Sequence, residues 1–145
     1  MKGRRQTLDS RELAIVAARA ASDKKAEDII AIDVAELLVV TDFFVICTGR
    51  TDRQVRTIAD EVEEQMRVQG GVKPIGREGV SEGRWILLDF GDVVVHVFQP
   101  EEREFYRLEK LWSDAPRVLL PEDVTGPVAQ MTTASLTTSE EDAGA

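Results

Sequence analysis

The sequence is poor in residues with reactive side chains, with one cysteine (Cys47) and one histidine (His96) among 145 residues. A single cysteine excludes an internal disulfide and a multi-cysteine zinc site, and it suits a reducing compartment. One cysteine and one histidine also supply too few ligands for a zinc site unless carboxylates join them. We therefore expect neither a bound metal nor another cofactor.

Long apolar runs are missing as well. No stretch reaches the roughly 18 residues that are needed to cross a bilayer. The beginning, MKGRRQTLDSRE, has no apolar signal-peptide core, and its acidic residues are untypical of a transit peptide. We expect a soluble, cytoplasmic protein with no membrane partner.

Dense clusters of basic residues are absent too. The formal net charge is -9, from 18 lysines and arginines against 27 acidic residues. Beyond Pro121 there is no lysine or arginine, and this end alone carries -5, which leaves -4 for the part before it. Proteins that bind DNA or RNA draw much of their binding free energy from basic groups that displace counterions from phosphates. We therefore expect no binding to DNA, and we expect a basic protein as the macromolecular partner.

The first half of the sequence predicts two helices and two strands. Asp9 and Glu12 form a capping-box pattern ahead of apolar residues at helical spacing. A second such pattern begins at Thr51, and the helix after it should stop at Gly70-Gly71. Between the helices lie two apolar runs that we interpret as strands, DIIAIDV (28–34) and TDFFVICTG (41–49). Because these runs lack strict alternation, we expect both of their faces to be covered.

The second half predicts a hairpin and a third helix. The glycine-rich segment 71–84 leaves room for one short edge strand. RWILLDF (84–90) and VVVHVFQ (93–99) flank a Gly91-Asp92 turn, which favours an antiparallel hairpin. Pro100 opens a helix with three apolar side chains that we expect to face inward: Phe105, Leu108 and Trp112.

Together these elements predict a single α/β domain, in which helices cover a mixed β-sheet. The predicted division is a flexible N-terminal arm at 1–8, the domain at 9–118 and an acidic, Ser/Thr-rich tail at 119–145. Such a tail buries too little apolar surface to offset the entropy of ordering it, so we expect it to be disordered.

Two kinds of catalytic site stay open at this point. Cys47 and His96 would form a nucleophilic pair if the fold brought them together, although a cysteine in an apolar strand is usually inert packing. Four aspartates lie at the ends of predicted strands: Asp33, Asp42, Asp89 and Asp92. A metal-dependent nucleotidyltransferase would hold magnesium at such positions, but no D-x-D or D-x-E pair lies there, which favours turn and cap roles.

Trp85 is the candidate for contact with a partner. By the two-residue period of a strand it shares a face with Leu87 and Asp89, while Ile86 and Leu88 point to the other face. A tryptophan beside carboxylates is typical of a protein-binding hot spot for a basic partner. The alternative, equally consistent with the pattern, is a tryptophan that covers the core beneath the loop before it.

Several longer motifs occur in order along the chain. They are DKKAEDIIAIDV (23–34), TDFFVICTGRTDRQVRTIADEVEE (41–64), the pair Glu78-Gly79 and WILLDFGDVVVHVFQPEEREFYRLEKLW (85–112). The last contains a W-x-L-L-D-x-G-D-x-V-V-H-x-F block followed by R-x-F-Y-x-L-E-x-L-W. In this order and spacing, the region from about residue 10 to 118 resembles the ribosomal silencing factor family, also called the Iojap family.

The resemblance implies a fold similar to that of nucleotidyltransferases, but without enzyme activity. Gly49-Arg50 stands where such an enzyme needs a Gly-Ser nucleotide loop, and the paired metal carboxylates are missing. It further implies binding to ribosomal protein fourteen, on the face of the large ribosomal subunit that meets the small subunit. The bound factor obstructs subunit joining and represses translation when nutrients are scarce. Many members of the family are homodimers when free.

From the resemblance we hypothesise that seven residues form or support the docking surface: Glu78, Trp85, Leu87, Asp89, His96, Phe98 and Tyr106. In this hypothesis Trp85 is the apolar anchor, the carboxylates pair with lysine or arginine of the ribosomal protein, and His96 orients or extends the patch. The competing hypotheses are a metal-dependent nucleotidyltransferase-like enzyme and an assembly factor of the large subunit.

Overall fold

The computed structural model describes residues 8–124. Its named helices and strands follow one another in the chain as α1 (Ser10–Asp23), β1 (Glu27–Asp33), β2 (Phe43–Thr48), α2 (Asp52–Gly70), β3 (Gly76–Glu78), β4 (Trp85–Asp89), β5 (Val93–Phe98), α3 (Pro100–Tyr106) and α4 (Leu108–Leu111). Within these residues no helix is long and apolar enough to cross a membrane.

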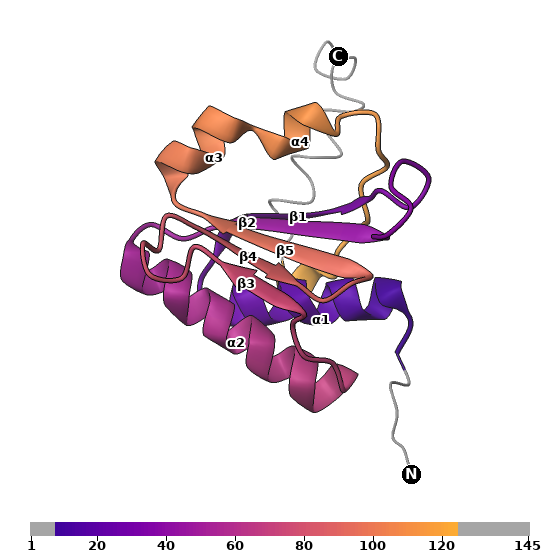
Figure 1. Ribbon diagram of the computed structural model, residues 1–145, viewed down its shortest axis with the longest axis horizontal. Helices are drawn as coiled ribbons and strands as arrows, with labels where there is room; N and C mark the ends of the chain where they lie inside the picture. Colours follow the sequence, from indigo (N-terminus) through magenta and orange to yellow (C-terminus); the bar gives the residue numbers. More distant parts are fainter. Residues whose placement is uncertain (1–7, 125–145) are drawn as a thin grey trace.

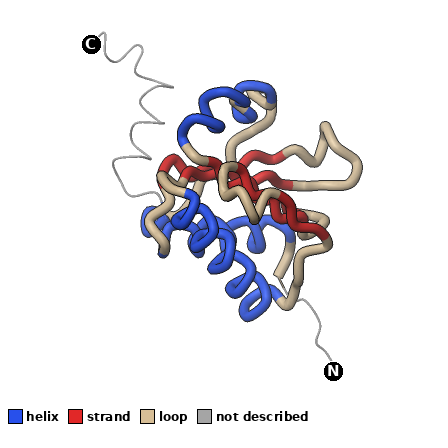
Figure 2. Tube along the Cα trace, turned by 60° about the vertical axis from the view of Figure 1, so that its left-hand side comes forward, coloured by secondary structure: helices blue, strands red, loops and turns tan. Residues whose placement is uncertain are grey.

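The strands form one mixed sheet in the order β1-β2-β5-β4-β3. Strands β2 and β5 are parallel, and the other neighbours are antiparallel, including the predicted β4–β5 hairpin. Helices α1 and α2 cover one face of the sheet, and α3 and α4 lie over the other face (Figures 1 and 2). The predicted α/β class and the mixed sheet with helical layers are confirmed.

Helix α1 begins with the predicted capping box. The Asp9 carboxylate accepts a hydrogen bond from the Glu12 N–H, and the Glu12 carboxylate accepts one from the Asp9 N–H. These two bonds satisfy donors that the first turn of a helix leaves without a partner.

Helix α2 is capped by half of the expected pattern. The Thr51 hydroxyl accepts from the Gln54 N–H, whereas the Gln54 side chain accepts from Arg50 instead of from the cap residue. The helix ends at Gly70 as predicted, and Gly71 adopts the left-handed conformation with φ 67°.

The main core fills the space between the sheet and helices α1 and α2. The central strands β2 and β5 are buried on both faces. The missing alternation predicted this for β2, whereas β1, for which it was also predicted, is exposed at Glu27 and Asp28. Strand β4 alternates, and its Ile86 and Leu88 are fully buried in this core. A smaller apolar cluster lies on the opposite face and consists of Ile32, Val34, Ile46, Phe98 and Ala115.

The predicted third helix is interrupted. Arg107 has a left-handed backbone conformation with φ 46°, which separates α3 from α4. Within α3, Phe105 is 78% exposed, so its predicted inward position is wrong. Leu108 and Trp112 are partly buried against the smaller cluster, as expected.

The chain after α4 returns to the outer edge of the sheet. The Asp33 N–H donates to the Pro116 carbonyl and the Val118 N–H donates to the Ala31 carbonyl, both at 2.8 Å. Further along, Leu120 and Val124 are buried in the main core. Leu120 and Val124, which the sequence assigned to the tail, therefore pack on the domain. Residues 1–7 and 125–145 lie outside the described residues, so the division into arm, domain and tail stays a prediction.

Candidate partner-binding face

Strand pairing brings the predicted docking residues onto one face of the sheet, opposite α1 and α2. Leu87 on β4 pairs with Glu78 on β3 and with His96 on β5. Trp85 pairs with Phe98 in the same way. Because paired residues on neighbouring strands point to the same side, Glu78, Leu87 and His96 form one row across the sheet.

Two further residues complete this face. Asp89 follows Leu87 by one strand period, and the Tyr106 ring of α3 lies 4.6 Å from the Trp85 ring, centroid to centroid. The structure thus brings all seven predicted residues together. We call the accessible five, Glu78, Trp85, Leu87, Asp89 and Tyr106, the docking face.

The other two residues lie beneath the docking face. His96 is 5% exposed and Phe98 is fully buried, so neither offers surface to a partner. Both rings contact the Trp85 indole on its buried side. The Phe98 ring stacks on the indole with 4.8 Å between centroids, and the Trp85 Nε1–H donates a hydrogen bond to His96 Nδ1 at 3.1 Å. Burial lowers the pKa of His96 to about 4, so the imidazole that accepts this bond is neutral near pH 7.

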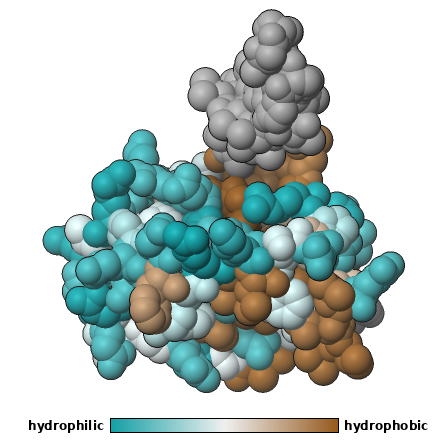
Figure 3. Space-filling model, turned by 90° about the horizontal axis from the view of Figure 1, so that it is seen from above, coloured by the Kyte–Doolittle hydropathy of each residue, from teal (hydrophilic) through white to brown (hydrophobic). Residues whose placement is uncertain are grey.

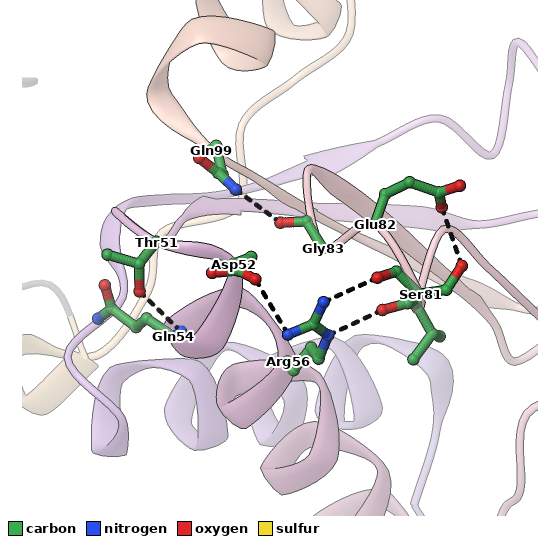
Figure 4. Close-up of polar contacts among 9 residues, drawn as sticks. Thr51, Asp52, Gln54, Arg56, Ser81, Glu82, Gly83 and Gln99 are labelled. Atoms are coloured by element: carbon green, nitrogen blue, oxygen red, sulfur yellow. Dashed lines mark hydrogen bonds and ion pairs between the residues drawn. The ribbon is translucent and has the colours of Figure 1, made fainter.

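The loop that leads into β4 is fixed from both ends (Figure 4). Arg56 of α2 donates to the carbonyl oxygens of Val80 and Ser81, at 2.9 and 2.7 Å. At the end of the loop, the Gln99 side-chain amide donates to the Gly83 carbonyl at 2.9 Å. These contacts fix where β4 begins, and with it the position of Trp85.

Arg103 fastens helix α3 to the sheet. Its guanidinium donates to the Thr48 hydroxyl at 2.7 Å, to the Asp28 carbonyl at 2.9 Å and to the Glu109 carboxylate at 3.1 Å. Only 12% of its side chain is exposed. Because Tyr106 lies on the same helix, Arg103 helps to hold one side of the docking face.

The sequence prediction missed two exposed apolar groups. Phe105 and Leu111 lie 78% and 70% exposed on α3 and α4. The loop between β1 and β2 exposes Leu37, Val39 and Val40, which belong to an apolar run, LLVV, that we had left unassigned. Seen from the side of α3 and α4, the molecule shows brown apolar areas between teal hydrophilic ones (Figure 3). The apolar run LLVV was the available sequence signal for the loop, whereas helical spacing had placed Phe105 on the inward side of its helix.

Comparison with known proteins decides the family. The sequence model described as "Ribosomal silencing factor during starvation" matches residues 7–144. The chain belongs to the ribosomal silencing factor family. It is 47% identical to ribosomal silencing factor RsfS of Bacillus subtilis, over 75% of this chain and 92% of that protein. It is 37% identical to the chloroplastic protein Iojap of Zea mays, over 76% of this chain and 47% of that protein.

Solved structures agree with this membership. A crystal structure of a protein from Chromobacterium violaceum, 37% identical, superposes with a TM-score of 0.71 over 73% of this chain and 88% of that one. A crystal structure from Bacillus halodurans, 44% identical, gives a TM-score of 0.67 over 76% of this chain and 99% of that one. The mixed sheet between helical layers is therefore the fold of ribosomal silencing factors.

Three of the four aspartates considered as magnesium ligands accept side-chain hydrogen bonds within the chain. Asp33 and Asp89 each accept from the backbone N–H two residues further on, at 3.1 and 2.8 Å. Asp42 accepts from the Ser10 hydroxyl at 2.9 Å. The Asp33 and Asp89 bonds are turn contacts, as expected, whereas the Asp42 bond joins two segments that are far apart in the sequence. The fourth, Asp92, accepts through its backbone carbonyl from the N–H groups of Asp42 and Phe43. Within residues 8–124, no group of three or more His, Cys, Asp and Glu side chains is arranged to hold a metal ion.

Cys47 and His96 do not form a nucleophilic pair. Ile46, one residue before Cys47, pairs with His96 on the neighbouring strand, so the Cys47 side chain points to the opposite face of the sheet. Burial raises the pKa of the fully buried Cys47 thiol to about 12, which keeps it protonated. The cysteine is part of the main core, as its apolar surroundings in the sequence suggested.

Proposed function

We propose that this chain binds the large ribosomal subunit through ribosomal protein fourteen and, while bound, obstructs the joining of the small subunit. The factor acts in the cytoplasm by occupying space, without catalysing a reaction, and so represses translation when nutrients are scarce. Membership of the family supports the ribosomal target, and the family description names starvation. The free chain is a homodimer in this proposal, as the resemblance implies.

The observation that carries the docking mode is the position of Trp85. The indole is half-buried, with Phe98 below it, Tyr106 at its side and His96 accepting its N–H, and these three contacts together hold the ring in place before a partner arrives. A rigid aromatic side chain in such a setting loses little conformational freedom on binding, which is a property of interface hot spots. Trp85 is therefore the apolar anchor of the docking face.

Charge supports a basic protein as the partner. Glu78 and Asp89 flank the apolar part of the docking face, and the whole chain carries -9. An acidic protein is repelled by the phosphates of ribosomal RNA, so its binding site on the ribosome has to be a basic protein surface. The two carboxylates then pair with lysine or arginine side chains at the rim of the interface, where they favour fast association more than affinity.

The test is to mix the purified chain with isolated subunits, separate the particles on sucrose gradients, and follow subunit joining by light scattering. We expect the chain to sediment with the large subunit alone and to slow the formation of joined ribosomes. Addition of free ribosomal protein fourteen should release the chain from the particles. Light scattering of the free chain measures its mass and so tests the homodimer.

Other results would contradict the proposal or favour an alternative function. A chain that sediments with neither subunit, or that binds the large subunit without slowing subunit joining, contradicts the proposal. A thermal stabilisation by a nucleoside triphosphate that requires magnesium would instead favour the nucleotidyltransferase-like alternative.

A further inference from the structure

His96 is a polar residue in an apolar environment, so the presence of a histidine at this position requires an explanation. It lies in the middle of β5, where the other residues are valines and Phe98, and it is 5% exposed. Its neighbours across the strands are Leu87 and Ile46, and the Phe44 ring meets it edge to face at 5.1 Å. A valine or phenylalanine would fill such a position without any desolvation of polar atoms.

One hydrogen bond explains the choice of histidine. The Trp85 Nε1–H only donates, so His96 Nδ1 must accept, and the proton of the neutral ring therefore lies on Nε2. His96 Nε2 is buried and has no hydrogen-bond partner among the described residues. The molecule thus leaves one ring nitrogen unsatisfied and uses the other to hold the indole. A buried N–H without a partner opposes folding, so among the described residues the contact that accounts for the imidazole is the one with Trp85.

We propose that His96 is a positioning residue for docking: by accepting the Trp85 indole N–H it holds the ring flat on Phe98 and leaves only carbon atoms of the indole for the partner. This inference rests on the proposed function and deepens it. Because the polar atom of Trp85 is already bonded inside the protein, the partner needs an apolar pocket and no hydrogen-bond acceptor at this point.

The remaining contacts of Trp85 do not fix the orientation of its ring by themselves. Stacking on Phe98 and contact with Tyr106 are apolar, and such contacts tolerate rotation of the indole about its side-chain bonds more readily than a directed hydrogen bond does. Without the hydrogen bond to His96, the Trp85 indole would not be fixed in the free chain, and binding to the partner would have to immobilise it. We expect the dissociation constant for the large subunit to rise roughly threefold to tenfold, as for one side chain that is ordered on binding.

The experiment compares two substitutions of His96. His96→Phe keeps a ring but removes the acceptor, and His96→Asn places a side-chain oxygen near the position of Nδ1. The first readout is the indole N–H resonance of Trp85 in the free ¹⁵N-labelled chain, assigned with Trp85→Phe, with the resonance of Trp112 as internal reference. The second is the dissociation constant for isolated large subunits.

We expect His96→Phe to shift the Trp85 resonance toward that of an unbonded indole and to weaken binding, and His96→Asn to restore a bonded resonance and much of the affinity. Trp85→Phe, which removes the donor and keeps an aromatic ring, should weaken binding as much as His96→Phe does. An unchanged Trp85 resonance in His96→Phe, or a shifted resonance with unchanged affinity, overturns the proposal. If the unsubstituted chain binds no large subunit, the proposed function fails on its own, and the resonance still shows whether His96 holds the indole.

Discussion

A Cβ atom on Gly79 would overlap the backbone carbonyl oxygen of Trp85. Gly79 also has a φ of 82°, in the left-handed region that residues with a Cβ atom rarely adopt. The turn into β4 is therefore built so closely around the first residue of the strand that only glycine fits. The close contact between Gly79 and Trp85 therefore links the shape of the loop to the position of Trp85, the proposed anchor.

Gly79→Ala should both destabilise the fold and displace Trp85. The unfavourable backbone conformation alone costs about 1–3 kcal/mol in the free energy of unfolding, and the overlap with the carbonyl adds to it. Chemical denaturation measures the loss. Gly76→Ala on β3 is the control, since no atom lies within 4 Å of its Cβ position, and it should change the free energy of unfolding by less than about 0.5 kcal/mol. Equal effects of the two substitutions would refute the account of the turn.

Arg103→Met should loosen helix α3. The substitution leaves the Thr48 hydroxyl, the Asp28 carbonyl and the Glu109 carboxylate without their common donor, so we expect a loss of about 2 kcal/mol in the free energy of unfolding. Arg107→Met is the matched control, because Arg107 pairs with Glu104 at the surface, and such pairs contribute at most about 1 kcal/mol. Hydrogen exchange of the α3 amides should accelerate in the first variant alone. Similar exchange in both variants would contradict the role given to Arg103.

Buried His96 predicts a loss of stability in acid. Its pKa is lowered from 6.5 to about 4 in the folded chain, so between these values the unfolded chain binds a proton that the folded chain excludes. Stability therefore rises with pH through this window and falls as the pH drops from about 6.5 to 4, by up to about 3 kcal/mol for this group. The measurement is the free energy of unfolding at pH 7 and pH 4.5, for the natural chain and for His96→Phe. Carboxylates titrate in both proteins, so the difference between the two slopes isolates His96, and parallel slopes would show that the group is not buried as described.

The two carboxylates of the docking face should act mainly on the rate of association. Replacing them together, Glu78→Gln with Asp89→Asn, should slow binding to the large subunit several-fold at low salt and have little effect at high salt, where charges are screened. Asp60→Asn with Glu64→Gln removes the same charge from helix α2 on the opposite side of the sheet and serves as the control. Rapid-mixing fluorescence at several salt concentrations measures the rates. A slowing that is the same in both double variants would indicate an effect of net charge and not of the docking face.

Local patterns predicted most of the elements, because each depends on neighbours in the chain. The capping residues Asp9 and Thr51 and the glycine after α2 act within one helical turn, and the alternation of Trp85, Ile86 and Leu87 depends on a single strand. The break at Arg107 had no such signal, since arginine rarely adopts the left-handed conformation and no glycine or proline marks the position. The exposure of Phe105 could not be foreseen because it depends on which side of the short helix α3 faces the sheet, and that side carries Tyr106.

Which of the candidate docking residues share a face of the sheet was predictable within one strand but not across strands. Strand alternation grouped Trp85, Leu87 and Asp89, whereas the place of Glu78 beside Leu87 depends on the β3–β4 register. Burial of His96 and Phe98 depends on contacts from outside the hairpin, because Phe44 of the parallel neighbour β2 packs on His96 and Tyr106 of α3 packs on Phe98. The hydrogen bond between Trp85 and His96 joins side chains on two strands and has no local sequence signal.

The most direct test of the central claim, that the docking face anchored by Trp85 binds the large subunit, is the dissociation constant of the chain and of Trp85→Ala for isolated large subunits. Val68→Ala, at an exposed apolar residue of α2 on the opposite side of the sheet, serves as the control. The account predicts that Trp85→Ala weakens binding by about 2 kcal/mol or more, roughly thirtyfold in the dissociation constant, and that Val68→Ala binds as the natural chain does. A folded Trp85→Ala chain that retained the full affinity would contradict it.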